Sequence, residues 1–286
     1  MSQIRSLDSI SSKSQNINQT NKGIAEHVPI SVIILTKNEE LFVERCIRSV
    51  IWADEYVVLD SGSTDKTKEI AASLGASVYH QDWLGWVPQR TKAISLAKHD
   101  WVFILEADEI VTPELAQSIQ IAMGQPKDER DGYSMDRRDD FHGELMPNIR
   151  RSKKNRNFIR LFNRKFSAYD SSMEVHEEVR CPGKAIFLSG VLMHWRGWQM
   201  DDQVSALNRY ATIESEVLFK EGKRANGLTI LLRPVFRFFW CYIVKGTFRK
   251  GIRGFNYAMV RAISEYIRYI KLWELENCSK DIHPNI

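Results

Sequence analysis

The chain has few cysteines, and none lies in a pattern that suggests a disulfide framework or a metal cluster. Its 286 residues include 4 cysteines, with no CxxC pair among them. They are Cys46, Cys181, Cys241 and Cys278. Scattered thiols of this kind argue against a disulfide scaffold and against a structural zinc site, and they are typical of a protein in a reducing compartment.

Long apolar runs and a strong charge of one sign are also missing. No stretch of roughly 18 or more uncharged apolar residues occurs, which argues against a clean membrane span. The N-terminus is rich in Ser, Asn, Gln and Lys and lacks the apolar segment of a signal peptide, so we expect residues 1–27 to form a disordered tail. The net charge of +4 is mild and does not indicate a nucleic-acid partner.

Apolar β-branched runs alternate with helical patterns as far as about residue 124. Strands are expected over 29–35, 56–59, 76–79 and 100–105, and helices over 41–50, 70–74, 89–98 and from 113 onward. Continuous apolar runs fit strands that are buried on both faces of a parallel sheet. The alternation therefore predicts the α/β class, with a mostly parallel sheet flanked by helices.

Polar clusters follow three of these strands at the points where the strands end. They are Thr36–Glu39, Asp60–Asp65 and Glu106–Glu109. In open α/β sheets, ligands bind at the carboxyl ends of the strands. Side chains two apart on a strand point to the same side, so we expect Glu106 and Asp108 to face one point. An acidic pair alone is more typical of a solvated turn or a helix cap, but three coincident clusters favour a site for Mg²⁺ or Mn²⁺ and a diphosphate.

The second half of the chain has a different pattern. The charge-dense segments 128–140 and 150–156 are expected to form loops, with short strands over 158–162 and 185–188. From residue 201 the pattern is helical to the end. We therefore expect a disordered tail over 1–27, a catalytic domain over 28–200 and a helical extension over 201–286.

The helical extension concentrates positive charge. Eleven lysines and arginines lie between Lys223 and Lys271, and Glu265 is the one acidic residue among them. Basic amphipathic helices that carry aromatic residues bind anionic membrane surfaces. This predicts a peripheral protein at the inner, cytoplasmic face of the cytoplasmic membrane. The alternative is a helical subdomain that packs on the catalytic sheet.

The order and spacing of these motifs resemble the family 2 glycosyltransferases, and most closely the branch that includes the lipopolysaccharide-core β-1,4-glucosyltransferases. The resemblance covers roughly residues 29–275. The motifs that carry it are segments 31–40, 52–55, 60–65, 105–109, 160–162, 175–177, 192–195, 208–210 and 271–275.

The resemblance implies a GT-A-like nucleotide-sugar fold and an inverting transfer of a hexose. The expected donor is UDP-glucose, and the expected acceptor is a lipid-linked saccharide such as lipopolysaccharide core. Carried over by motif, Thr36, Asn38 and Glu39 would border the nucleoside, and Asp60 would also bind the nucleotide. We expect Ser61, Gly62, Arg90 and Glu106 to complete the nucleotide-binding set. Asp60 would accept a hydrogen bond from the uracil ring. Asp108 would bind the Mg²⁺ or Mn²⁺ ion. His194 follows an apolar run, and from this position it could complete the metal shell or bind the diphosphate, or it could be a packing residue.

The chain departs from the family pattern at two positions. Glu106 stands where the family usually has Asp, so we expect it to touch the ribose or a metal-bound water. Arg90-Thr91 stands where the family often has Lys-Asn. The Arg90 guanidinium can still clamp a phosphate in bidentate fashion.

Inverting transfer needs a carboxylate base that reaches the acceptor hydroxyl. We assign this role to Glu177 in the segment Val175-His176-Glu177-Glu178, with Glu178 as second candidate and a surface charge cluster as the alternative. His176 could orient Glu177 or contact phosphate, or be structural. Asp65 is expected to be structural at the start of a helix. Trp83 and Trp86 could stack on a base or sugar, or pack in the core.

Two other functions remain open from the sequence. A nucleotidyltransferase on a similar fold would carry a glycine-rich basic loop after the first strand, but that position holds Thr36-Lys37-Asn38-Glu39. A non-catalytic membrane adaptor that retains the fold would bind no nucleotide.

Overall fold

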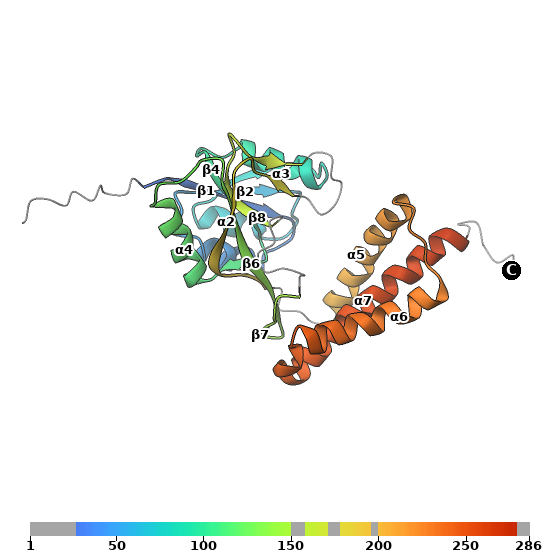
Figure 1. Ribbon diagram of the computed structural model, residues 1–286. Coiled ribbons are helices and arrows are strands. Elements are labelled where there is room, and N and C mark those ends of the chain that lie inside the picture. The colour runs from blue at the N-terminus through green and yellow to red at the C-terminus, as the bar shows by residue number, and fades with distance from the viewer. Residues whose placement is uncertain (1–26, 150–157, 171–177, 196–199, 279–286) are drawn as a thin grey trace, which may run out of the picture.

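The computed structural model describes residues 27–149, 158–170, 178–195 and 200–278. The N-terminal part is a sheet flanked by helices, and the C-terminal part is a group of long helices beside it (Figure 1). The two parts meet near the hairpin formed by β6 (Gly132–Phe141) and β7 (Glu144–Leu145). The expected α/β class and the helical extension are both present.

The central sheet has the strand order β3-β2-β1-β4-β8-β6-β11-β5, with β7 paired to β6. The pairs β3–β2, β2–β1, β1–β4 and β6–β11 are parallel, and the pairs β4–β8, β8–β6 and β11–β5 are antiparallel. The strands are β1 Ile30–Thr36, β2 Glu55–Asp60, β3 Ser77–His80, β4 Trp101–Glu106, β5 Glu109–Val111, β6 Gly132–Phe141, β7 Glu144–Leu145, β8 Ile159–Asn163 and β11 Ala185–His194. A separate pair is formed by β9 Ala168–Tyr169 and β10 Val179–Arg180.

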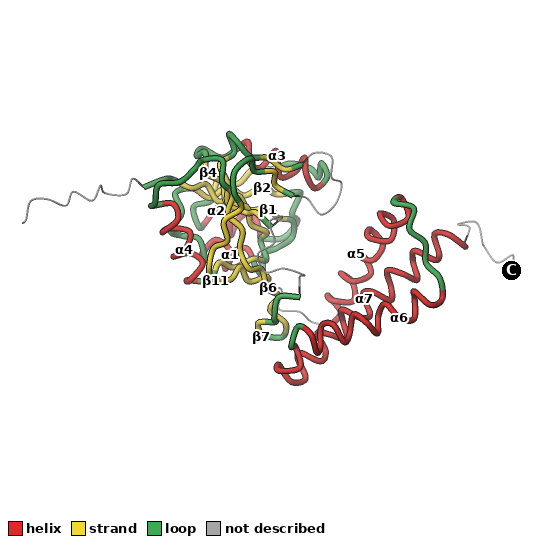
Figure 2. Tube along the Cα trace, viewed as in Figure 1, coloured by secondary structure: helices red, strands yellow, loops and turns green. Residues whose placement is uncertain are grey.

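Helices cover both faces of the sheet. One face packs against α1 Val43–Arg48, α2 Thr67–Ser73 and α4 Pro113–Met123, and the other face packs against α3 Trp86–Ser95. Successive residues of β1 alternate between the two cores, with Val32 and Ile34 on the first and Ile33 on the second. This burial on both faces is why the strands are continuous apolar runs. The tube view shows the strands enclosed between these helices (Figure 2).

Strand β6 corrects the expectation of loops over 128–140. Tyr133 and Met135 are buried in the core, and the charged residues 136–139 that follow them form ion pairs. Asp136, for example, binds the Arg138 guanidinium at 2.7 Å. Charge density suggested a solvated loop, but oppositely charged partners on β6 and on other elements neutralise these side chains, so the strand can be buried.

The helical extension consists of three long helices. They are α5 Met200–Lys220, α6 Gly227–Phe239, which continues as a π-helical turn η1 Trp240–Val244, and α7 Gly251–Asn277, which follows the short helix η2 Thr247–Lys250. Helix α7 packs against both α5 and α6. Gly254 allows the close return of the chain, because a Cβ at this position would lie 1.8 Å from the carbonyl oxygen of Thr247.

The segment Gly227–Val244 is long and apolar enough to cross a membrane, by length and composition alone. It includes Arg233 and Arg237, so it is not an uncharged apolar run. Only a small share of it is buried within the protein.

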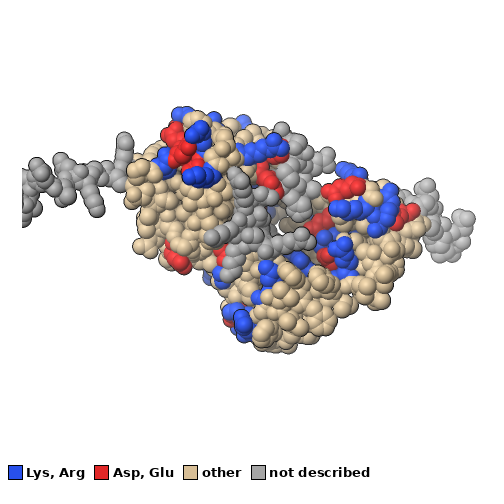
Figure 3. Space-filling view, viewed as in Figure 1, with Lys and Arg blue, Asp and Glu red and all other residues tan. Residues whose placement is uncertain are grey.

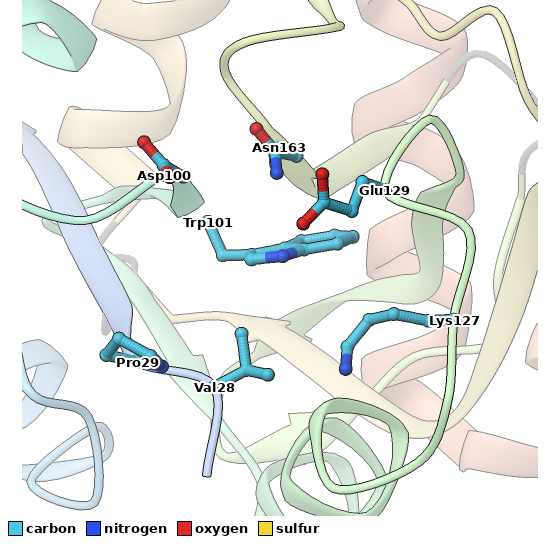
Figure 4. A pocket seen from close by; sticks show the side chains of 7 residues that line it. All are labelled: Val28, Pro29, Asp100, Trp101, Lys127, Glu129 and Asn163. Carbon is cyan, nitrogen blue, oxygen red and sulfur yellow. The ribbon is translucent and has the colours of Figure 1, made fainter. Parts of the chain in front are cut away.

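A hollow of about 270 Å³ lies at the N-terminal ends of β1 and β4. Its lining side chains surround the ring of Trp101 (Figure 4). It lies at the sheet edge opposite to the polar strand ends.

Candidate functional site

The carboxyl ends of β1, β2 and β4 lie side by side, as the three polar clusters predicted. In the sheet register Thr36 pairs with Asp60, and Leu35 pairs with Glu106. The Thr36 hydroxyl is buried and has no hydrogen-bond partner among the described residues, which fits a position that borders a ligand.

The loops after β1 and β2 are bound to each other. The Asn38 side-chain oxygen accepts a hydrogen bond from the Thr64 amide at 2.8 Å, and the Asn38 amide donates to the Ser63 hydroxyl at 2.8 Å. The Glu39 amide donates to the Thr67 hydroxyl at 2.8 Å. Asn38 has a φ of 55°, a conformation that asparagine tolerates better than most residues. These contacts make one rigid rim of the predicted nucleoside-binding residues.

Asp60 is fully buried at the base of this rim. One carboxylate oxygen accepts the amides of Gly62 and Ser63 at 2.9 and 2.8 Å, and the other accepts the Ser63 hydroxyl. Gly62 has a φ of 91°, which lets the chain turn back over the carboxylate. Asp60 therefore shapes the loop, and its recognition of a uracil ring stays a prediction.

Two flanking residues have structural contacts. The Asp65 carboxylate accepts the Thr67 amide at 3.0 Å and the Glu40 amide at 3.2 Å. This is the structural role at the start of a helix that was expected of Asp65. Ser61 is buried and its hydroxyl accepts a hydrogen bond from the Gln89 amide group at 2.9 Å.

A cluster of charged side chains surrounds the end of β4. Arg90 binds Glu106 at 3.0 Å, and Arg137 binds Glu109 at 2.7 Å. Arg160 lies 3.2 Å from Glu109 and 3.7 Å from Glu106. We call Glu106, Glu109, Arg90, Arg137 and Arg160 the arginine cluster. Three guanidinium groups thus converge on two carboxylates in a largely buried place, and Arg137 also lies 3.5 Å from Asp139.

The arginine cluster holds Glu106 in its charged form. Burial alone would raise the Glu106 pKa, but Arg160 and Arg137 outweigh it and lower the pKa below its usual value. Arg90 was expected to clamp a phosphate, and in the structure it is 6% exposed and binds Glu106. Its contact with phosphate stays a prediction, as does the contact of Glu106 with ribose or a metal-bound water.

Asp108 has a different side-chain partner from Glu106. Strand β4 ends at Glu106, and Asp108 lies in the turn before β5, so the alternation expected for a continuous strand does not apply. The carbonyl oxygen of Asp108 accepts the Trp195 amide at 2.8 Å, which ties this turn to the end of β11. The Asp108 carboxylate lies 3.0 Å from His194 Nε2.

His194 lies between two carboxylates. Its Nε2 faces Asp108, and its Nδ1 lies 3.1 Å from Asp139 on the neighbouring strand β6. Burial and the nearby Arg137 would lower the His194 pKa, but Asp108 and Asp139 reverse this and raise it to about 9. Burial would raise the Asp139 pKa, whereas Arg261 and His194 hold it well below its usual value. Without a metal, His194 is therefore positively charged at neutral pH.

Asp108 and His194 together offer a carboxylate and an imidazole nitrogen to a cation. No group of three or more His, Cys, Asp or Glu side chains in the described ranges is placed to hold a metal ion. Two protein ligands suit Mg²⁺ or Mn²⁺ bound with a diphosphate, because these ions take one or two protein ligands and complete their shell with phosphate and water oxygens. Asp139 behind the imidazole is the usual partner that orients a metal-binding histidine. The residues present thus fit the expected metal.

The predicted catalytic base Glu177 and its neighbour His176 lie outside the described residues. Glu178 is described, and its carbonyl oxygen accepts the Asp170 amide at 2.9 Å. Of the two tryptophans, Trp86 packs edge-on against Trp83 and lies under the Arg90 guanidinium.

Sequence reasoning missed four charged residues of this region as site residues. They are Glu109, Arg137, Asp139 and Arg160. Glu109 and Arg160 lie within the family motifs, whereas Arg137 and Asp139 lie in a segment that the sequence predicts to be a loop. The alternation of Tyr133, Met135, Arg137 and Asp139 on one side of a strand was the available signal.

Comparisons with known proteins agree on the class of protein. The family model described as Glycosyl transferase family 2 matches residues 31–192, more than half of the 286-residue chain. An uncharacterized glycosyltransferase of Rickettsia typhi, RT0209, is 31% identical over 268 residues, which cover 88% of this chain and 89% of that protein. The lipopolysaccharide core biosynthesis glycosyltransferase LpsC of Rhizobium meliloti is 29% identical, with 86% of this chain and 93% of that protein covered.

A solved structure is similar over a smaller part. It is the crystal structure of glucosyl-3-phosphoglycerate synthase from Mycobacterium tuberculosis in complex with Mn²⁺, uridine diphosphate and glucosyl-3-phosphoglycerate. The match covers 39% of this chain and 44% of that chain, at 25% identity and a TM-score of 0.32.

Proposed function

Because this chain belongs to glycosyl transferase family 2, we propose that it transfers a hexose, with inversion, from a nucleotide diphosphate sugar to a lipid-linked saccharide. The membership confirms the resemblance seen in the motifs, the GT-A-like fold and the enzyme class. It also favours sugar transfer over nucleotidyl transfer or a non-catalytic adaptor. The proposed donor is UDP-glucose and the proposed acceptor class includes lipopolysaccharide core, as the likeness to LpsC supports.

The observation that carries the proposal is the pair of Asp108 and His194 beside the arginine cluster. Asp108 and His194 lie 3.0 Å apart and would hold Mg²⁺ or Mn²⁺, which supplies positive charge to the leaving diphosphate when it is bound. The arginine cluster gathers three guanidinium groups nearby, and this concentration of positive charge favours an anionic ligand. The rim formed by Asn38, Glu39 and Asp60 would border the nucleoside.

The reaction also needs a general base that takes the proton of the acceptor hydroxyl. We keep Glu177 in this role, with Glu178 as second candidate, because a carboxylate in this segment can remove the proton as the new glycosidic bond forms. The bond to the diphosphate breaks in the same step, and inversion follows because the hydroxyl attacks from the opposite side of the sugar ring.

The helical extension supports a membrane-bound location. Helices α6 and α7 expose two apolar stripes with helical spacing. The stripe of α6 and η1 contains Leu228, Leu231, Leu232, Val235, Phe236, Phe239 and Ile243, and the stripe of η2 and α7 contains Phe248, Ile252, Phe255, Met259, Ile263 and Tyr266. Figure 3 shows a broad uncharged surface on the lower side of the extension, with Lys and Arg at its borders.

The contacts at the end of the α6–α7 hairpin favour a helix that lies in the membrane surface rather than across it. Lys250 and Arg253, just beyond the segment Gly227–Val244, both face Glu144 of strand β7. A crossing helix would carry these residues to the side opposite the catalytic domain, and the contacts with Glu144 would break. We therefore propose an in-plane arrangement, with the catalytic domain at the cytoplasmic face and anionic lipids as the partner.

The test of the transfer is a donor screen. Purified protein and Mn²⁺ are incubated with single nucleotide sugars and extracted membrane glycolipid, and the products are read by mass. We expect a hexose adduct with UDP-glucose and its loss in Asp108→Ala and Glu177→Gln, with Glu69→Gln on the exposed face of α2 as the control. Full metal-dependent activity in both variants would remove the site assignment.

The test of the location is vesicle sedimentation. Wild-type protein should sediment with vesicles that contain phosphatidylglycerol, and the double variant Phe236→Ser/Ile252→Ser should bind much more weakly. Ile121→Ser serves as control, because Ile121 is similarly exposed but lies on α4 of the catalytic domain. Equal loss of binding in the control and the double variant would count against the proposed face.

A further inference from the structure

Helix α7 reaches from the helical extension to the back of the candidate site. The Tyr257 hydroxyl donates to Asp139 at 2.6 Å, and an Arg261 guanidinium nitrogen donates to the same carboxylate oxygen. Tyr257 and Arg261 are four residues apart on α7, so they lie on one face of the helix. Asp139 is thereby held by two donors that are far from it in sequence.

We propose that Tyr257 and Arg261 are positioning residues of the glycosyltransferase site, which act through Asp139 on His194. The proposal rests on the proposed function, because it assumes that Asp108 and His194 form the metal site. It makes α7 a part of the catalytic centre rather than a separable membrane anchor.

The contacts form a continuous chain of alternating charge. Arg261 and Tyr257 bind one oxygen of Asp139, and the other oxygen lies 3.1 Å from His194 Nδ1. His194 and Asp139 are also direct neighbours in the register of β11 and β6. With Nδ1 held by Asp139, the opposite nitrogen Nε2 is directed at Asp108, 3.0 Å away. The orientation of the metal-facing nitrogen thus depends on contacts made by α7.

Burial makes these contacts specific. The Tyr257 side chain is 2% exposed and packs edge-on against Phe141 of β6, in an apolar cluster with Met146 and Val260. A hydrogen bond to a charged carboxylate in such a place contributes more than an exposed one. Burial would lower the Arg261 pKa, but Tyr257 and Asp139 raise it, so Arg261 stays charged.

The two faces of α7 have different surroundings. Tyr257 and Arg261 face the catalytic domain, whereas Ile252, Met259 and Ile263 belong to the exposed apolar stripe. The membrane-facing stripe and the support of His194 are therefore built on a single rigid helix.

The experiment compares variants of α7 in two measurements on the full chain. The variants are Tyr257→Phe, Arg261→Gln and Arg261→Lys. Arg268→Gln is the matched control. Arg268 also lies on α7 and forms partly buried ion pairs, with Glu265 and with Glu214 of α5, but Asp139 is not among its ion-pair partners in the described residues. Tyr266→Phe is the control for Tyr257→Phe, because the Tyr266 side chain is exposed.

The first measurement is the affinity for Mn²⁺ with UDP, read from the electron paramagnetic resonance signal of free Mn²⁺. Loss of a residue behind a metal ligand costs roughly 10-fold or more in metal affinity. We expect a loss of about 10-fold in Arg261→Gln, a smaller loss in Tyr257→Phe, partial recovery in Arg261→Lys and no change in either control.

The second measurement is amide hydrogen exchange at the ends of β6 and β11, without metal or nucleotide. We expect faster exchange around Asp139 and His194 in Arg261→Gln but not in Arg268→Gln. The proposal is overturned when Arg261→Gln matches Arg268→Gln in both measurements. If wild-type protein fails to bind Mn²⁺ with UDP, the proposed metal site is wrong, and the exchange result still decides whether α7 supports His194.

Discussion

Neutralising Glu109 tests whether the arginine cluster is a tightly coupled unit of charges. Glu109 is fully buried and accepts hydrogen bonds from Arg137 at 2.7 Å and Arg160 at 3.2 Å. Its second oxygen accepts the Glu106 amide at 3.0 Å at the end of β4. The substitution Glu109→Gln keeps the shape of the side chain and removes its charge, so two guanidinium groups lose their shared partner.

The magnitude follows from the distances. At an effective dielectric constant of about 20, two unit charges about 4 Å apart interact by about 4 kcal/mol, so two such pairs give about 8 kcal/mol. Burying the charged carboxylate costs several kcal/mol of desolvation, and this cost disappears when the charge is removed. Removal also relieves repulsion with Glu106. We therefore expect Glu109→Gln to lower the free energy of unfolding by about 3–5 kcal/mol, the range for one broken buried ion pair.

The assay is urea unfolding followed by circular dichroism, with linear extrapolation to water. The control is Glu44→Gln, which removes an exposed pair with Arg48 on α1 and should change the free energy of unfolding by at most about 0.5 kcal/mol. A change for Glu109→Gln as small as that of the control would refute the reasoning, because it would mean that water screens the cluster.

Three further predictions concern His194, Gly254 and Asp60. With a chelator present, we expect the wild-type protein to have a higher free energy of unfolding than His194→Gln. This difference should be complete below the unfolded pKa of about 6.5 and disappear as pH rises through the folded pKa of about 9. Urea titrations in which the difference grows with pH would contradict this. Gly254→Ala should cost about 1–3 kcal/mol because its Cβ meets the Thr247 carbonyl, whereas Gly227→Ala, with open space around it, should be nearly neutral by thermal unfolding. Asp60→Asn should cost about 1.5–3 kcal/mol, since charged acceptors of the Gly62 and Ser63 amides are lost, and an unchanged unfolding midpoint would argue against the role of Asp60 in shaping the loop.

Much of the fold could be predicted because the local pattern and the burial agree. The apolar runs that became β1, β2 and β4 are buried on both faces, so their composition alone distinguishes them from surface strands. The polar clusters at their ends were predicted to meet for the same reason, since parallel neighbours end at one edge of the sheet. Strand β6 was not predicted, because its charged residues resemble a loop until their partners on other strands are known.

The candidate site was predicted in part. Asp108 and His194 are brought together from positions 86 residues apart, and the family motifs placed both in the site. The alternation argument that linked Glu106 to Asp108 was wrong, because β4 ends at Glu106 and the chain turns. The role of Glu177 stays a prediction, since it lies outside the described residues.

The sequence by itself determined the α/β class, the enzyme family and the edge of the sheet where chemistry takes place, because periodicity and short motifs are local properties. Only the tertiary structure decided which charges face one another. Arg90, Arg137 and Arg160 come from one helix and two strands, and Arg261 comes from the helical extension. Ion pairs of this kind depend on distances across the fold, which no spacing along the chain encodes. The acidic motif at the end of β4 was visible in the sequence, and its division between the arginine cluster and His194 was not.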